Sequence, residues 1–157
     1  MGKSRFLEVP SFWPVPDGKG HWVARDRIVF YSDRYDCTIY IEAGSLNNLA
    51  SIPWIFRRMF AVNGPHRIAA ALHDPLYELK GVTVNRTFSK KECDLLFYDA
   101  MLASKRSVFE AYSGIGKLYV GNANLKSPLM DDSPTVNPMI AKLMHAGLRV
   151  AFWREWV

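Results

Sequence analysis

The sequence has little cysteine and no long apolar run, and each shortage excludes a class of protein. Two cysteines, Cys37 and Cys93, occur among 157 residues. That is too few for a disulfide framework, so we expect both thiols to be reduced. No apolar run approaches the roughly 18 residues that a membrane-spanning helix needs. The start, Met1 to Arg5, has no apolar core behind it. We therefore expect no signal peptide, no transmembrane segment, and a cytoplasmic location after synthesis.

The chain also lacks clusters of basic charge. Its 20 lysines and arginines against 15 acidic residues give a formal net charge of +5. Such a charge attracts phosphate, nucleic acid or anionic membranes. The longest basic runs, however, are Arg57-Arg58 and Lys90-Lys91. Because no basic stripe is present, we do not expect a nucleic-acid partner. An anionic surface or a lipid substrate remains a possible partner.

The pattern along the chain predicts one α+β domain. Residues 21–31 and 35–42 are rich in β-branched and aromatic side chains, which predicts a β-hairpin or small antiparallel sheet followed by four to five helices. The apolar positions that alternate in these segments are Ile28, Phe30, Ile39 and Ile41. The expected organisation of this single domain, 1–157, is an irregular arm (1–20), a β region (21–45), a helical region (51–120), a loop (121–137) and a C-terminal helix (138–157).

Capping signals mark the expected helix ends. Ser89 and Glu92 form a capping box, in which each side chain satisfies a free backbone N–H of the other residue. Gly81 is placed to end the preceding helix, and Asn137 to begin the last one. The expected helices cover residues 51–60, 66–80, 90–104, 107–120 and 138–157. The expected buried faces are Cys93, Leu96, Phe97, Ala100 and Met101 on the helix after Ser89, and Ile140, Leu143, Met144, Gly147 and Ala151 on the last helix.

A histidine and an aspartate on successive predicted helices form the main candidate site. His73 follows the apolar run Ile68 to Leu72 and shares a helix face with Tyr77, four residues on. A neutral histidine accepts a proton near pH 7, and a buried carboxylate such as Asp94 would hold its ring in one tautomer. We therefore predict that His73 and Asp94 are catalytic, within about 2.6–3.2 Å of each other or bridged by one water. The alternative is that these polar groups brace a helix junction.

Asp74, beside His73, is the candidate metal ligand. The Asp74 carboxylate, the Asn63 side chain and the loop carbonyls around Gly64 are oxygen donors, which suit calcium or another hard divalent cation. Such a cation would polarise a carbonyl or phosphoryl oxygen. Pro75 disfavours helical geometry at Asp74, and a kink there would turn the Asp74 side chain out of the regular helix.

Three motifs occur in order: Leu49-Ala50-Ser51-Ile52-Pro53, then Ala70 through Tyr77, then Ser89 through Asp94. Together they resemble a family of uncharacterised phage and prophage proteins, domain of unknown function 1353. This resemblance implies a phage or prophage origin but carries no activity. Asn48 stands where that family usually has aspartate, so the resemblance gives Asn48 a supporting place in the site.

The arrangement of His73, Asp74 and Tyr77 on one helix with Asp94 on the next also resembles viral and microbial phospholipase A2. This resemblance implies that His73 is the base, Asp74 a calcium ligand, Tyr77 a bracing hydroxyl and Asp94 the orienting carboxylate. The chain departs from those enzymes because it lacks their glycine-rich calcium loop, with Gly64 alone nearby. The likeness is one of geometry and does not identify a substrate.

Two classes of function therefore stay open. The first is a small phage-encoded hydrolase that uses the His–Asp site, with or without a divalent cation. The second is a virion structural or assembly protein of the tail, neck or capsid, without catalytic activity. The aromatic segments 10–22 and 152–157 support it, because aromatic residues anchor interfaces. A basic inhibitor or adaptor is a third reading. The expected partners are other phage proteins or a host factor, in the host cytoplasm or in the virion.

Overall fold

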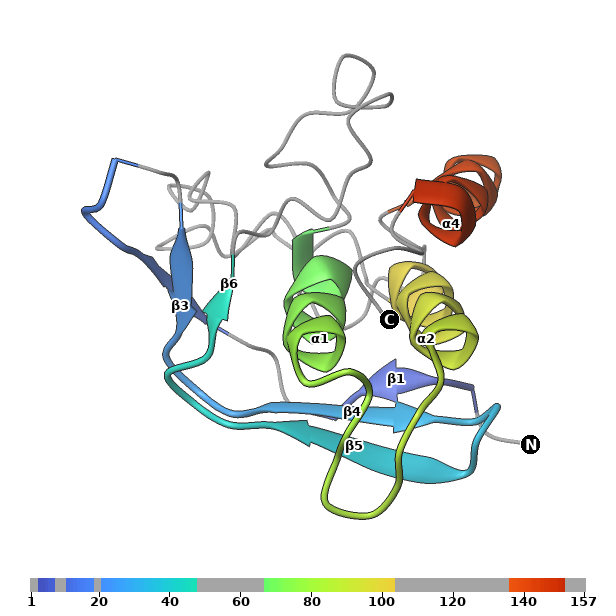
Figure 1. The fold of residues 1–157 in the computed structure, drawn as a ribbon, viewed down its shortest axis with the longest axis horizontal. Helices are drawn as coiled ribbons and strands as arrows, with labels where there is room; N and C mark the ends of the chain where they lie inside the picture. Colours follow the sequence, from blue (N-terminus) through green and yellow to red (C-terminus); the bar gives the residue numbers. More distant parts are fainter. Residues whose placement is uncertain (1–2, 8–10, 19–20, 48–66, 104–135, 152–157) are drawn as a thin grey trace, which may run out of the picture.

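A computed structural model of the chain describes residues 3–7, 11–18, 21–47, 67–103 and 136–151. Within these ranges short strands come first and helices follow (Figure 1), so the expected α+β class is confirmed. The expected count of four to five helices is not met, because the described residues form three. The helices expected over 51–60 and 107–120, and most of the expected loop 121–137, lie outside the described residues.

The first sheet contains the predicted hairpin. Strands β1 (Arg5–Phe6), β4 (Ile28–Ser32) and β5 (Cys37–Ile41) pair antiparallel in the order β1-β4-β5. The predicted alternation is confirmed, because the side chains of Ile28, Phe30, Ile39 and Ile41 are all buried. Residues 33–36 form the turn between β4 and β5, and Asp36 takes a φ of 44° there. Aspartate is one of the few side chains that tolerate this left-handed conformation.

A second sheet stands beside the first. Strands β2 (Phe12–Pro14), β3 (Trp22–Ala24) and β6 (Leu46–Asn47) pair antiparallel in the order β2-β3-β6. The β-rich segment 21–31 contributes to both sheets, because β3 and β4 belong to different sheets. The break falls at Arg25-Asp26-Arg27. Three consecutive charged residues interrupt the alternation of a half-buried strand, which explains the break.

The expectation of an irregular arm over residues 1–20 was also wrong in part. Both β1 and β2 fall in this segment, each at the edge of its sheet. The edge location explains how a proline-rich segment forms strands. Pro14 is the last residue of β2, where its missing N–H removes no bond from the centre of the sheet. The proline pattern therefore limits the length of these strands without preventing their pairing.

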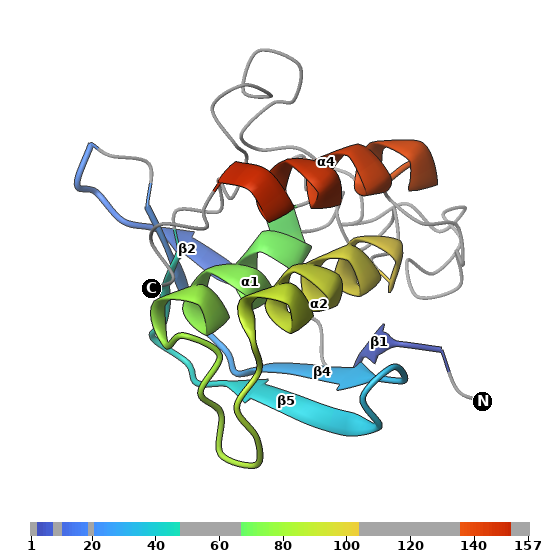
Figure 2. The ribbon, with the colours of Figure 1, turned by 45° about the vertical axis from the view of Figure 1, so that its right-hand side comes forward.

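The helices form layers above the first sheet. Helices α1 (Arg67–Glu78) and α2 (Lys90–Ala103) lie side by side across it, and α4 (Pro138–Ala151) packs on α2 on the side away from the sheet (Figures 1 and 2). The largest fully buried side chains between these layers include Phe30, Leu72, Leu76, Phe88, Leu96, Phe97 and Met101. Among the helices of the described ranges, none has the length and apolar character needed to cross a bilayer.

Two helix starts follow the predicted capping patterns. The Ser89 N–H donates to Glu92 Oε2 at 2.8 Å, and the Glu92 N–H donates to Ser89 Oγ at 3.3 Å, so the capping box that begins α2 is confirmed. Asn137 Oδ1 accepts the N–H of Met139 at 2.8 Å at the start of α4. Side-chain oxygens thus accept hydrogen bonds from backbone N–H groups at both helix starts, where the helix itself offers no acceptor.

The end of α1 also follows the sequence, although the helix passes through a proline. Pro75 lies inside α1 without ending it, and Asp74 is buried and not turned out to solvent. Gly81 follows α1 with a φ of 78° and donates its N–H to the Leu76 carbonyl at 2.7 Å. A Cβ at Gly81 would lie 1.9 Å from the carbonyl oxygen of Phe88. Glycine is therefore required here both by the backbone angle and by the close approach.

The buried face of α4 differs from the expected one. Ala141, Met144 and Leu148 are buried, whereas Leu143 is exposed and Ile140 is partly buried. The buried three are spaced by three and four residues, which is the spacing of one helix face. The buried face of α4 thus includes the small Ala141 and leaves out the larger Leu143. The sequence pattern had instead predicted that the larger Leu143 lies on the buried face.

Candidate functional site

The structure brings the predicted pair His73 and Asp94 together between α1 and α2. His73 Nε2 lies 3.4 Å from Asp94 Oδ1, slightly beyond the expected 2.6–3.2 Å. The two side chains are 3% and 0% exposed, so solvent barely screens the contact. The helix faces explain the meeting. On α1, His73 lies three and four residues from the buried Ala70 and Ala69, and on α2, Asp94 lies three residues from the buried Phe97.

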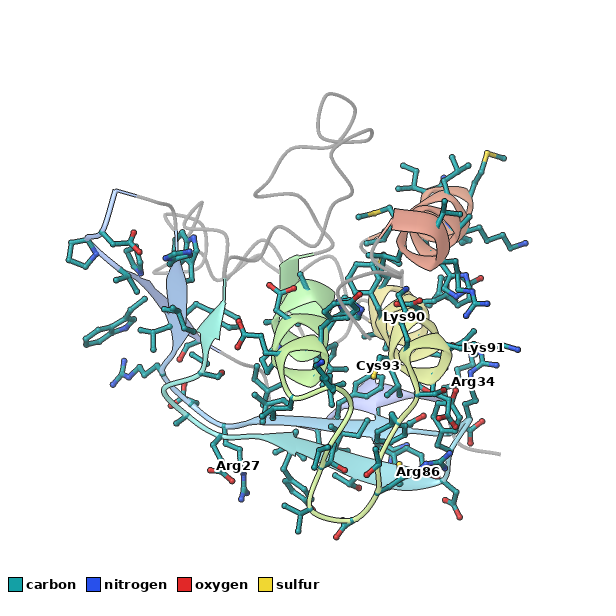
Figure 3. The ribbon with its side chains drawn as sticks, in the orientation of Figure 1. Arg27, Arg34, Arg86, Lys90, Lys91 and Cys93 are labelled. Carbon is teal, nitrogen blue, oxygen red and sulfur yellow. The ribbon has the colours of Figure 1, made fainter. Side chains whose placement is uncertain are left out.

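Lys90 is a third member of this cluster that the sequence reading missed. Its Nζ donates to Asp94 Oδ2 at 2.8 Å and to the backbone carbonyl of Leu148 at 2.8 Å, and the side chain is 3% exposed. Figure 3 shows Lys90 on the side of α2 toward the neighbouring helices, whereas the exposed Lys91 points outward. The spacing of Lys90 and Asp94, four residues apart on one helix, was an available signal.

The Asp94 carboxyl is held in its ionised form. Burial alone would raise its pKa, but hydrogen bonds from His73 and Lys90, together with the charge of Lys90, outweigh burial and lower the pKa of Asp94 below its usual value. Asp94 is therefore a carboxylate at neutral pH. Its two oxygens are divided between two donors, with Oδ1 toward His73 and Oδ2 toward Lys90.

Aromatic rings surround the imidazole of His73. Its ring centroid lies 5.4 Å from that of Tyr77 and 5.0 Å from that of Phe97. The Nζ of Lys90 also lies 5.9 Å from the centroid of the Tyr77 ring, a distance compatible with a cation–π contact. Within the described part of the chain, His73 Nδ1 is buried and has no hydrogen-bond partner. The ring thus has one nitrogen near a carboxylate and one nitrogen free to accept a proton or a ligand.

Cys93, next to Asp94 on α2, is not a nucleophile at neutral pH. Burial, with the nearby charge of Asp94, raises the pKa of the Cys93 thiol to about 12. The thiolate, which is the reactive form, is then scarce near neutrality. The thiol is fully buried in the hydrophobic core. Cys93 therefore serves packing, and a cysteine–histidine mechanism finds no support at this position.

The predicted metal ligands do not assemble within the described residues. Asp74 is buried on α1, and no cluster of three or more His, Cys, Asp or Glu side chains that could hold a metal ion occurs in the described ranges. Asn48, the supporting residue, and Asn63 and Gly64, the other oxygen donors, lie outside those ranges. Because these predicted oxygen donors are not described, the metal role of Asp74 stays a prediction.

A second histidine, His145 on α4, lies near the same carboxylate. Its ring is 5.6 Å from that of Tyr98 on α2, and its Nε2 is buried without a hydrogen-bond partner in the described structure. Burial lowers the pKa of His145, and the negative charge of Asp94 opposes this effect in part. The side chain is partly buried, in keeping with the packing role that its apolar neighbours on the helix indicate.

A polar hollow lies at the other end of α2. It encloses about 450 Å³ and is lined by Lys3, Ser4, Asp33, Arg34, Asp99, Leu102 and Ala103. Arg34 and Asp99 face each other there through two hydrogen bonds of 2.7 and 2.8 Å. Of the predicted site residues that the structure describes, none borders this hollow. The candidate site is therefore a buried cluster between helices, separate from this hollow.

The fold and the cluster define a small α+β protein with a buried His–Asp–Lys group between its helices. The chain belongs to the family described as Protein of unknown function (DUF1353), whose profile matches residues 23–114. The matched segment contains His73, Lys90 and Asp94, whereas Leu148 lies beyond it. No curated protein and no solved structure matches the chain.

Proposed function

We propose that the protein is a small hydrolase in which His73 is the general base and Asp94 orients it. The observation that carries the proposal is the arrangement at the His73 ring: Nε2 faces the Asp94 carboxylate, and the buried Nδ1 has no hydrogen-bond partner within the described residues. An ionised Asp94 accepts a hydrogen bond from Nε2–H and so fixes the proton on that nitrogen. Nδ1 then keeps its lone pair and can take a proton from water or a hydroxyl.

The cost of the cluster supports a role beyond packing. Moving charged groups into a protein interior carries a desolvation penalty, and replacing a buried ion pair by apolar side chains is often neutral or stabilising. His73, Lys90 and Asp94 are nonetheless buried beside Leu72, Phe97 and other apolar side chains. Clusters of this kind occur often at functional sites, because burial and neighbouring charges tune the acids and bases there.

The three motifs that resemble phage and prophage proteins support the further proposal that the protein is phage-encoded and acts in the host cytoplasm. The description of the family to which the chain belongs names no activity, so the family neither supports nor opposes hydrolysis. The proposed reaction assigns no step to a divalent cation, and calcium binding by Asp74 remains a separate prediction.

A second candidate function is a virion structural or assembly protein. It is favoured by the outer side of α4, where Met139, Leu143 and Val150 are exposed. These residues are spaced by four and seven positions and form one apolar stripe, which is the kind of surface that partner proteins cover. Quantitative mass spectrometry of purified virions distinguishes the two functions. A structural protein is present in many copies, whereas an enzyme of the host cytoplasm is absent or scarce.

The hydrolase proposal is tested with purified protein and chromogenic nitrophenyl carboxylic esters, phosphodiesters and phosphorylcholine. We expect release of nitrophenol from at least one of these substrate classes, with a loss of at least about 100-fold in His73→Gln, which is the lower range for removal of a general base. Lys91→Met is the matched control, because this exposed neighbour of the cluster should keep full activity. Turnover of none of these substrates, or equal turnover by His73→Gln, would contradict the proposal.

A further inference from the structure

The buried cluster includes the positive charge of Lys90, which a pair of neutral His73 and ionised Asp94 does not have. Asp94 is ionised and fully buried, so it needs a positive charge close by. If His73 supplied that charge as an imidazolium, it would already hold the proton that a general base must accept. Lys90 offers a second source, because its Nζ lies 2.8 Å from Asp94 Oδ2 and the side chain is 3% exposed.

We propose that Lys90 is a positioning residue of the site, whose ammonium keeps Asp94 ionised while the His73 ring stays neutral and able to accept a proton. The inference rests on the proposed role of His73 as the base. The three groups then carry charges of plus one, minus one and zero, so their summed charge is zero. Each Asp94 oxygen has one donor: Nε2–H of His73 on Oδ1, and the ammonium of Lys90 on Oδ2.

The position of Lys90 is fixed from a third helix. Its Nζ also donates to the carbonyl of Leu148 on α4 at 2.8 Å. The ammonium of Lys90 therefore contacts two acceptors at once, the Asp94 carboxylate and this backbone carbonyl. By this contact α4 becomes part of the site, although it lies beyond the segment that matches the family profile.

A purely mechanical role for Lys90 predicts a different outcome from a charge-balancing role. In Lys90→Met the aliphatic stem is kept and the charge is removed. Asp94 would then be buried without the Lys90 cation, and the His–Asp pair should take up a proton more readily than in the native protein. The proton affinity of the pair should rise at least about tenfold, which corresponds to one pKa unit. A structural role alone would loosen α4 and leave the protonation of His73 and Asp94 unchanged.

The test is nuclear magnetic resonance of the full-length protein, following the ring nitrogens of His73 and the carboxyl carbon of Asp94 across neutral pH. We expect a neutral ring and an ionised carboxyl in the native protein. In Lys90→Met we expect an imidazolium ring or a protonated carboxyl. Lys90→Arg, which keeps the charge, should restore the native signals, and Lys91→Met should not change them. Native protonation of both groups in folded Lys90→Met would overturn the inference.

If Lys90→Met does not fold, the native protein still decides the matter. An ammonium that is buried and bonded to Asp94 and to the Leu148 carbonyl exchanges its protons slowly. We therefore expect a resolved side-chain ammonium signal that Lys91 does not give and that Lys90→Arg removes. The lack of a protected ammonium signal in the native protein would overturn the inference. These measurements use no substrate, so their failure is separate from a failure to detect hydrolysis.

Discussion

Two aspartates of α2 each form an ion pair, and the two pairs differ in how deeply they are buried. Asp94 pairs with Lys90, and the two side chains are 0% and 3% exposed; Asp99 pairs with Arg34, and the two are 11% and 42% exposed. Five residues place the two carboxylates about 140° apart around the helix axis. One pair therefore faces the neighbouring helices, and the other faces the turn between β4 and β5.

The exposed pair has the better geometry, yet the buried pair has the larger consequences. Arg34 holds Asp99 through two hydrogen bonds, an arrangement that joins the β4–β5 turn to α2. Water screens this contact and also hydrates either partner when the other is removed. Water cannot hydrate Lys90 or Asp94 in this way, because both side chains are buried. Burial, more than the number of bonds, should decide how strongly each pair affects stability and chemistry.

The largest expected difference between the pairs is the loss of stability on removing one partner. Asp94→Asn leaves the Lys90 ammonium buried without a carboxylate, so we expect a loss of about 3–5 kcal/mol in the free energy of unfolding. Asp99→Asn leaves a half-exposed arginine, and we expect a loss of no more than about 1 kcal/mol. Urea unfolding of both variants measures the two losses. Similar losses would show that burial does not distinguish the pairs.

An intermediate effect is expected in acid. The pKa of Asp94 is lower in the folded protein than its ordinary value of about 3.9 in an unfolded chain. Its contribution to stability is therefore present above about pH 4 and is lost as pH falls through the folded pKa. The double variant Lys90→Met with Asp94→Leu removes the pair without leaving a buried charge. We expect unfolding measured below pH 4 to depend less steeply on pH in this variant. An unchanged slope would assign acid sensitivity to other groups.

The smallest expected effect is that of salt. At about 1 M ionic strength the screening length falls to roughly 3 Å, which weakens exposed pairs more than buried ones. Double-mutant cycles at low and high sodium chloride should therefore show a coupling energy that falls for Arg34 with Asp99 and changes little for Lys90 with Asp94. A coupling of Lys90 and Asp94 that fell equally with salt would indicate that ions and water reach the cluster.

The sequence predicted the elements that local chemistry determines. The capping box at Ser89, the stop at Gly81 and the alternation in β4 and β5 depend on neighbouring residues, and all three are present. The approach of His73 to Asp94 was predictable because each residue lies beside the apolar side of its helix, and the two helices are successive in the sequence. The catalytic assignment of this pair stays a prediction, as does the supporting place of Asn48, which lies outside the described residues.

Other features depended on packing between distant segments. Lysine is almost never fully buried unless it is paired, so the basic run Lys90-Lys91 indicated a solvated surface. The burial of Lys90 needs both Asp94 and the Leu148 carbonyl, which lies 58 residues away. The same limit applies to the orientation of α4, whose buried face includes Ala141 in place of Leu143. It also applies to the division of the strands between two sheets, since pairing partners are chosen across the chain.

The short sequence separation of His73 and Asp94 has a consequence for the order of folding. The two residues are 21 residues apart, on helices that residues 79–89 connect. Closing a loop of this size costs little chain entropy, and local contacts of this kind form fast. The contact from Lys90 to Leu148 closes a much longer loop. We therefore expect the growing chain to assemble the ring and the carboxylate first, and to complete the cluster when the C-terminal helix arrives.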